Sequence, residues 1–116
     1  VHSLMMTEDG KLIGTSSYSR SRTAQFHDFG EIISIYLLPE YMGRGYGRLL
    51  LEAAVKELEK LGYEDIFLWV LAENRNARKF YERCGFTPTQ HYMYHEIGGK
   101  KLQEIQYCRL SGKDGH

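Results

Sequence analysis

Several features that would assign a chain to a special class are scarce in this sequence. It has only two cysteines, Cys84 and Cys108, which lie far apart and lack the paired spacing of a metal site. Two buried or half-buried thiols are therefore expected rather than a disulfide. No apolar run approaches the length of a membrane span, and no basic-then-apolar leader opens the chain. We expect a cytoplasmic protein that does not act on a membrane.

An excess of charge is also lacking, since 15 basic residues balance 15 acidic ones. A neutral chain has no general field that attracts nucleic acid, so we expect no nucleic-acid partner, and any attraction for phosphate must be local. Among the five histidines, His91 and His95 can share one face of a strand, but they lack cysteine or carboxylate partners at ligand spacing. No metal site is expected.

The length and composition set the domain organisation. With 116 residues and 42% hydrophobic content, the chain is long enough for one compact core and short for two. We therefore expect a single domain over residues 1–116, with residues 111–116 as a flexible tail. No internal repeat or low-complexity segment interrupts it.

The chain is organised around residues 39–51, PEYMGRGYGRLLL, which follow an apolar run and open an amphipathic pattern. Gly43, Gly45 and Gly47 have no Cβ, so a ligand can approach the backbone closely there. Amides at the start of the following helix lack intrahelical acceptors and favour anions, and Arg44 and Arg48 add cationic donors. The stretch predicts a phosphate-binding loop. A glycine-rich turn without a ligand remains the alternative, since the loop fits neither a P-loop nor a dinucleotide fingerprint.

The remaining pattern predicts an alternation of strands and helices. Asp9-Gly10 is a strong hairpin signal, and Gly62 and Gly85 close two helices. A strand, helix, strand order in the middle of the chain implies a parallel crossover. The expected strands are 3–6, 11–19, 31–38, 66–71, 86–96 and 101–110, and the expected helices are 47–61 and 76–84.

Two motifs follow one another along the chain. The first is the loop Met42-Gly43-Arg44-Gly45-Tyr46-Gly47, and the second is residues 74–86, NRNARKFYERCGF. Together they resemble the motifs of the GNAT family of N-acetyltransferases. The resemblance extends from the first hairpin to Leu110. It implies an α/β fold with a mixed, mostly antiparallel sheet, a central parallel strand-helix-strand crossover and a C-terminal β-hairpin.

The resemblance implies an enzyme that moves an acetyl group from acetyl-CoA directly to a primary amine, with acetyl-CoA as co-substrate. The loop amides would hold the pyrophosphate, and the strand ahead of the loop would pair with the pantetheine arm. An oxyanion would be held by a backbone amide near Leu37. The implied cofactor-binding residues are Tyr36, Leu37, Leu38, Met42, Gly43, Arg44, Gly45, Tyr46, Gly47, Arg48, Asn74 and Tyr81.

Three residues have both a functional and a structural interpretation. By the resemblance, Tyr81 is the general acid or hydrogen-bond donor for the leaving thiolate, although a core aromatic on a short helix has the same pattern. Glu31 stands where some relatives carry a general base, or it is an ordinary strand-end carboxylate. Asn74 is a coenzyme A contact or a helix cap. Cys84 has no nearby histidine partner, so no acyl-enzyme is proposed.

The sequence departs from the family pattern in two places. Met42 stands where Arg or Gln is preferred, but its backbone amide would still be available for phosphate. The strand and two helices that usually precede the first hairpin are absent, so the chain is truncated or a partner chain supplies them, for example in a homodimer that exchanges elements. The acceptor, a small-molecule or peptide amine, is not identified. The alternatives are a catalytically inactive coenzyme A-binding module and a nucleotide or sugar-phosphate binder.

Overall fold

The structure is a computed structural model that describes residues 1–110. It divides into two compact units, Val1–Ile66 and Phe67–His116, each of which is described by itself. The predicted tail at residues 111–116 lies outside the described residues. The single domain stays a prediction.

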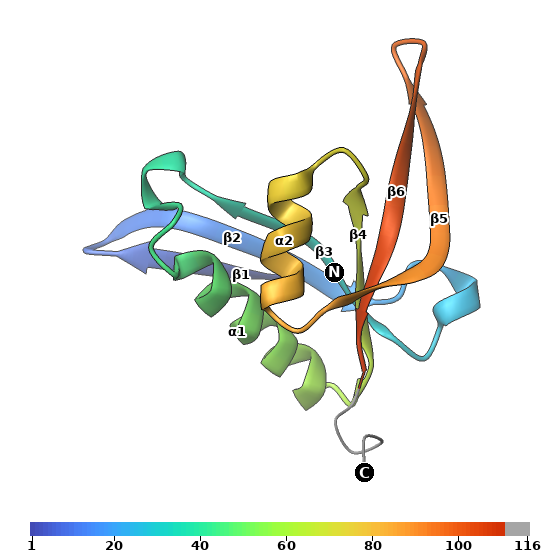
Figure 1. The fold of residues 1–116 in the computed structure, drawn as a ribbon. Coiled ribbons are helices and arrows are strands. Elements are labelled where there is room, and N and C mark those ends of the chain that lie inside the picture. The colour runs from blue at the N-terminus through green and yellow to red at the C-terminus, as the bar shows by residue number, and fades with distance from the viewer. Residues whose placement is uncertain (111–116) are drawn as a thin grey trace. The chain divides into compact units, whose positions relative to one another are not determined.

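Three antiparallel strands form the sheet of the first unit, in the order β1 (His2–Glu8), β2 (Lys11–Arg20) and β3 (Gly30–Leu37) (Figure 1). The predicted hairpin at Asp9-Gly10 is confirmed. Both residues have positive φ, 50° and 79°, as a type I′ turn requires. The tight turn sets the register that places Glu8 directly opposite Lys11.

The predicted amphipathic helix is also confirmed, as α1 (Tyr46–Lys60). It packs on strands β2 and β3 of the first unit. Gly14 of β2 lets β3 lie close to it, because a Cβ there would lie 2.9 Å from Leu37 Cδ1 and 2.9 Å from the Tyr36 carbonyl oxygen. The buried side of α1 consists of Leu50, Leu51, Ala54, Val55 and Leu58. Two short 3₁₀ helices that the sequence pattern did not predict, η1 (Ala24–Phe26) and η2 (Pro39–Tyr41), lie before and after β3.

Helix α2 (Arg75–Arg83) lies in the second unit with the last three strands of the chain, of which the final strand lies between the other two. The long predicted hairpin of β5 (Thr87–Ile97) and β6 (Lys100–Arg109) is confirmed. Its turn residues Gly98 and Gly99 have φ of 60° and 81°. Strand β4 spans Ile66–Leu71, and its first residue belongs to the first unit.

Cys84 and Cys108 are both buried cysteine thiols, as expected. Across residues 1–110, no helix is long and apolar enough to cross a membrane. The cytoplasmic location stays a prediction.

Candidate active site

The loop between η2 and α1 adopts the backbone that its glycines predict. Gly43 and Gly45 have φ of 77° and 89°, and Gly45 is the N-cap residue of α1 in the left-handed region. A Cβ built at either glycine would have no atom within 4 Å. The backbone here is therefore open to a ligand, and its conformation strongly favours glycine.

The amides of this loop form an uninterrupted row of available donors. The first hydrogen bond of α1 runs from the Leu49 amide to the Gly45 carbonyl, at 3.2 Å. Within the described residues, the amides of residues 43–48 donate no hydrogen bond to the protein. Because the N-terminus of a helix also has a partial positive charge, this row can hold an anion such as a phosphate group.

Met42 differs from its neighbours in the loop. Its amide donates to the carbonyl of Pro39 at 3.1 Å, so this donor is already engaged. Its side chain is exposed. The sequence motif begins at Met42, but the row of available donors therefore begins one residue later, at Gly43.

The side chains of the predicted cations lie at the protein surface. Arg44 and Arg48 are exposed. The Arg44 guanidinium lies 5.3 Å from the centre of the Tyr41 ring, a cation–π distance. Arg44 thus contacts the ring of Tyr41 within the same loop.

At the end of β3, the backbone amides point alternately toward β2 and away from it. The Leu38 amide donates to the Ile13 carbonyl of β2 at 2.8 Å. Since successive residues of a strand point their amides to opposite edges, the Leu37 amide points away from β2. The Leu37 side chain is buried and that of Tyr36 is exposed.

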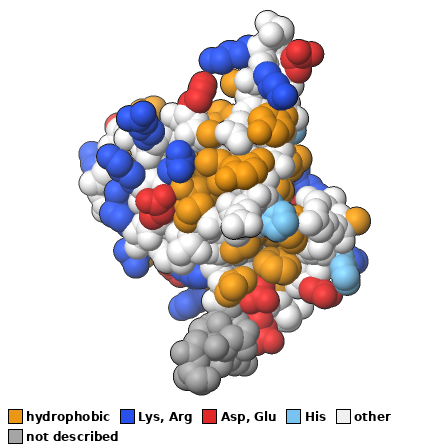
Figure 2. Space-filling model, turned by 45° about the vertical axis from the view of Figure 1, so that its right-hand side comes forward, with side chains coloured by type: hydrophobic (Ala, Val, Ile, Leu, Met, Phe, Trp, Pro, Cys, Tyr) orange, Lys and Arg blue, Asp and Glu red, His pale blue; other side chains and the backbone are white. Residues whose placement is uncertain are grey.

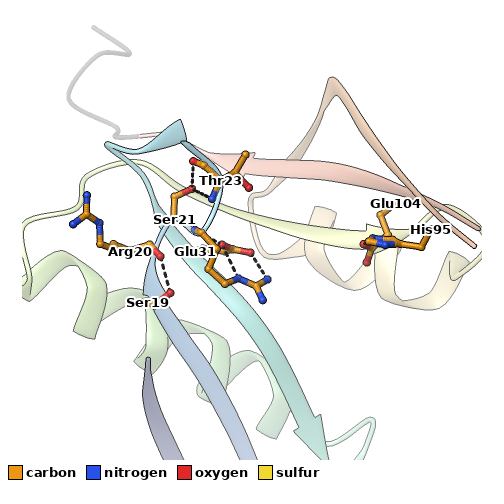
Figure 3. A network of polar contacts seen from close by, with 8 residues as sticks. Ser19, Arg20, Ser21, Thr23, Glu31, His95 and Glu104 are labelled. Carbon is orange, nitrogen blue, oxygen red and sulfur yellow. Dashed lines mark hydrogen bonds and ion pairs between the residues drawn. The ribbon is translucent and has the colours of Figure 1, made fainter. Parts of the chain in front are cut away.

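Glu31, the candidate general base, is 1% exposed and held by an arginine (Figure 3). Arg22 donates from Nη2 to Oε2 at 2.7 Å and from Nε to Oε1 at 3.2 Å. The Arg22 backbone amide donates to Oε1 at 3.0 Å. A two-point pair of this kind fixes both side chains. Sequence reasoning did not predict it, because nothing in the polar segment 19–23 distinguishes Arg22 from Arg20.

The segment that carries Arg22 is itself ordered by short polar contacts (Figure 3). The Ser21 hydroxyl donates to the Thr23 carbonyl at 2.9 Å and accepts from the Thr23 amide at 3.0 Å. The Ser21 amide donates to the Phe29 carbonyl at 2.9 Å. These contacts give Arg22 a defined backbone from which both its amide and its guanidinium reach Glu31.

In the second unit, Asn74 caps α2. Its Oδ1 accepts a hydrogen bond from the Ala77 amide at 3.1 Å. The helix-cap interpretation of Asn74 is therefore confirmed. A contact between Asn74 and coenzyme A stays a prediction.

Tyr81 lies on α2 with a half-buried ring and a hydroxyl that is not engaged. The ring is packed edge-on against Phe80 at 5.3 Å and Phe86 at 6.2 Å between centroids. Within residues 1–110 its hydroxyl makes no hydrogen bond to the protein. Burial, and secondarily the nearby Cys84, raises the pKa of Tyr81 above 10.0. The phenol thus stays protonated at neutral pH and can donate.

Tyr107 of β6 shows what a structural tyrosine looks like in the same unit. It is fully buried, its hydroxyl donates to Glu82 Oε2 at 2.7 Å, and it accepts from Arg78 Nε at 3.0 Å. Arg78 also donates to the Ala72 carbonyl at 3.1 Å. The Tyr107 hydroxyl thus both donates and accepts within the second unit, whereas the Tyr81 hydroxyl does neither within the described residues.

The β5–β6 hairpin offers further polar and aromatic side chains. His95 Nε2 lies 2.7 Å from Glu104 Oε1 (Figure 3), and Lys101 Nζ lies 4.5 Å from the centre of the Tyr94 ring. Figure 2 shows charged side chains around the tip of the hairpin and apolar or aromatic ones below it. In the described part of the chain, no group of three or more His, Cys, Asp or Glu side chains could hold a metal ion.

Comparison with known proteins identifies the family. The model of the Acetyltransferase (GNAT) family matches residues 1–86, so the chain belongs to this family. It is 32% identical over 98 residues to the uncharacterized N-acetyltransferase YuaI of Bacillus subtilis, covering 84% of this chain and 56% of YuaI. It is 31% identical over 86 residues to the [ribosomal protein bS18]-alanine N-acetyltransferase of Haemophilus influenzae, covering 72% of this chain and 58% of that protein.

The fold is that of solved GNAT proteins. YncA of Salmonella typhimurium, solved with its cofactor acetyl-CoA, superposes with a TM-score of 0.79 over 93% of this chain and 63% of its own, at 24% identity. The predicted fold class, α/β with mostly antiparallel strands and a C-terminal hairpin, is confirmed. The chain spans less than two thirds of the length of the curated relatives named above.

Proposed function

We propose that the chain is an N-acetyltransferase that uses acetyl-CoA as co-substrate and acetylates a primary amine by direct transfer. The observation that carries the proposal is the row of available amides at residues 43–48, which starts at left-handed Gly43. Such a row suits a pyrophosphate, because it offers successive donors at a helix N-terminus, and a Cβ at Gly43 or Gly45 would have no atom within 4 Å.

The reaction sets the roles that the residues must fill. The amine nitrogen bonds to the thioester carbon, the carbon–sulfur bond breaks, the sulfur takes up a proton and the ammonium loses one. Tyr81 is assigned the proton donor for the sulfur, because its hydroxyl is protonated and not engaged within the protein. The Leu37 amide, which points away from β2, is assigned to the oxyanion. Glu31 is assigned the base.

The cofactor contacts follow from the same backbone. The amides of residues 43–48 are assigned to the pyrophosphate, with Arg44 and Arg48 as flanking cations, and the backbone of residues 36–38 is assigned to the pantetheine arm. Met42 contributes its exposed side chain rather than its amide, because that amide is bonded to Pro39. Asn74 acts mainly as the cap of α2.

The acceptor is proposed to be an amine of a peptide or a small molecule. The H. influenzae relative acts, by its name, on an alanine of ribosomal protein bS18, so a peptide α-amine is the first acceptor to test. The exposed Tyr92 and Tyr94 of β5 are surfaces that a peptide can contact. We also propose a homodimer in which the two protomers exchange secondary-structure elements.

A thiol-release assay tests the function. The protein is incubated with acetyl-CoA and a panel of peptide α-amines, amino acids, polyamines and arylamines, and coenzyme A release is followed with a thiol reagent. We expect micromolar binding of acetyl-CoA in isothermal titration and release above the no-amine rate with at least one member of the panel. Binding without release on any amine would favour the inactive coenzyme A-binding module. Absence of binding would overturn the proposal.

The role of Glu31 requires a paired experiment, since the carboxylate also holds Arg22. If Glu31 is the base, Glu31→Gln should lower kcat about 100-fold, within the usual contribution of general base catalysis. Arg22→Met breaks the same ion pair but retains the carboxylate, so its kcat should fall far less.

Urea unfolding of both variants separates chemistry from stability. Both changes remove the buried pair, so both should lose stability, by about 1–3 kcal/mol for an unpaired buried group. Equal losses of kcat in Glu31→Gln and Arg22→Met would assign Glu31 to the fold of the segment 19–23 and exclude it as the base.

A further inference from the structure

The turn of the β1–β2 hairpin is attached to the loop that carries the amide row. The Tyr46 hydroxyl donates a short hydrogen bond to Glu8 Oε1. Tyr46 is the first residue of α1, and its own amide belongs to the row. Glu8 is half-buried and lies 38 positions earlier in the chain. One carboxylate of the first hairpin therefore holds the residue at which the helix begins.

The hairpin geometry explains why Glu8 reaches this place. The type I′ turn pairs Glu8 with Lys11, and directly opposite residues of an antiparallel pair project from the same face. The pairing of β1 with β2 shifts its register between Met6 and Thr7, just before Glu8. Lys11 also contacts the loop, because its Nζ lies 5.7 Å from the centre of the Tyr41 ring.

The aromatic residues of the loop complete the attachment. The Tyr41 and Tyr46 rings lie 5.8 Å apart, and the Arg44 guanidinium lies 5.3 Å from the Tyr41 ring. The glycines between these residues provide no anchor, because a Cβ at Gly43 or Gly45 would touch nothing within 4 Å. Among these residues, the contacts with the hairpin are made by Tyr41 and Tyr46, whose partners there are Lys11 and Glu8.

We propose that Glu8 is a positioning residue that pre-organises the amide row for the pyrophosphate of coenzyme A through its hydrogen bond to Tyr46. This inference rests on the proposed function. A glycine-rich segment loses much conformational entropy when it is ordered, so fixing it before binding lowers the cost of binding. A hydrogen bond to a carboxylate is stronger than a neutral one and is suited to this task. The same bond is the main cause of the raised pKa of Tyr46, which keeps the hydroxyl protonated.

The direction in which Glu8→Gln changes the affinity for coenzyme A distinguishes a positioning role from a purely electrostatic one. A carboxylate beside an anion site repels the anion, so if Glu8 acted only by its charge, Glu8→Gln would tighten binding. If Glu8 positions the loop, Glu8→Gln weakens the bond to Tyr46 and loosens the amide row. We then expect the Kd of coenzyme A to rise about fivefold, which corresponds to about 1 kcal/mol.

The experiment compares Glu8→Gln with Glu59→Gln by isothermal titration. Glu59 is an exposed residue of the same unit, near the other end of α1, and its substitution makes the same change of charge. Coenzyme A and its phosphate-free fragment pantetheine are the two probes. We expect Glu8→Gln to weaken only coenzyme A, and Glu59→Gln to weaken neither. Tyr46→Phe should reproduce the loss, and the double variant with Glu8→Gln should add little to it.

Each outcome is decisive. Unchanged or tighter coenzyme A binding by Glu8→Gln overturns the positioning role while leaving the proposed function in place. Equal weakening of coenzyme A and pantetheine also overturns it, because the effect would then not pass through the phosphate-binding loop. A wild-type chain that does not bind coenzyme A overturns the proposed function and the positioning role together. Melting temperatures of all variants show that each is folded at the temperature of the titration.

Discussion

Replacement of Gly45 by valine is expected to weaken acetyl-CoA binding at least about 100-fold, or about 2.7 kcal/mol. The residue has φ of 89°, where a β-branched side chain is a severe outlier. Relief of that strain requires the backbone to rotate, and rotation at the N-cap reorients the amides of the first helical turn, which are assigned to the phosphate. Isothermal titration with acetyl-CoA measures the loss directly.

Gly62 provides a matched control at the other end of α1. Its φ is 103°, and a Cβ there also has no atom within 4 Å, so Gly62→Val introduces the same kind of strain without touching the amide row. Both variants should lose stability in urea unfolding, and only Gly45→Val should lose acetyl-CoA. Comparable losses of binding in the two variants would show that general destabilisation is the cause, and tight binding by Gly45→Val would exclude the loop as the phosphate site.

The features that could be predicted from the sequence are those encoded within a few residues. Asp9-Gly10 indicated its turn because both residues tolerate positive φ, and the three- and four-residue spacing of apolar residues indicated α1. The cap of α2 by Asn74 belongs to the same group, since its partner Ala77 is three positions away. Family motifs then gave the loop and Tyr81 their expected functions.

The contacts that the sequence did not reveal join residues far apart in the chain. Glu8 meets Tyr46 across 38 positions, and Tyr107 meets Arg78 across 29. No local pattern distinguishes these residues from other charged or aromatic ones, because their pairing depends on strand register and helix placement. Arg22 and Glu31 are only nine positions apart, yet their contact depends on the ordered segment between β2 and β3.

Tyr81→Phe is expected to lower kcat about 100- to 1,000-fold with little change in the Kd of acetyl-CoA, as for loss of a general acid. The phenol pKa is raised above 10.0, mainly by burial, so the protonated form that donates persists through neutral and mildly alkaline pH. Any loss of wild-type activity due to Tyr81 should therefore occur at a higher pH than for an ordinary tyrosine, and that alkaline limb should be absent from Tyr81→Phe. Single-turnover rates with the best amine of the panel isolate the chemical step.

Tyr107→Phe is the matched control, because it removes the same hydroxyl from a tyrosine of the same unit. Its loss leaves Glu82 and Arg78 without their shared partner, so stability should fall by about 1–3 kcal/mol while kcat changes little. Tyr81→Phe should leave stability nearly unchanged, since its hydroxyl makes no hydrogen bond within the described residues. Wild-type turnover by Tyr81→Phe would remove Tyr81 from the chemistry, and loss of stability without loss of kcat would make it a core aromatic.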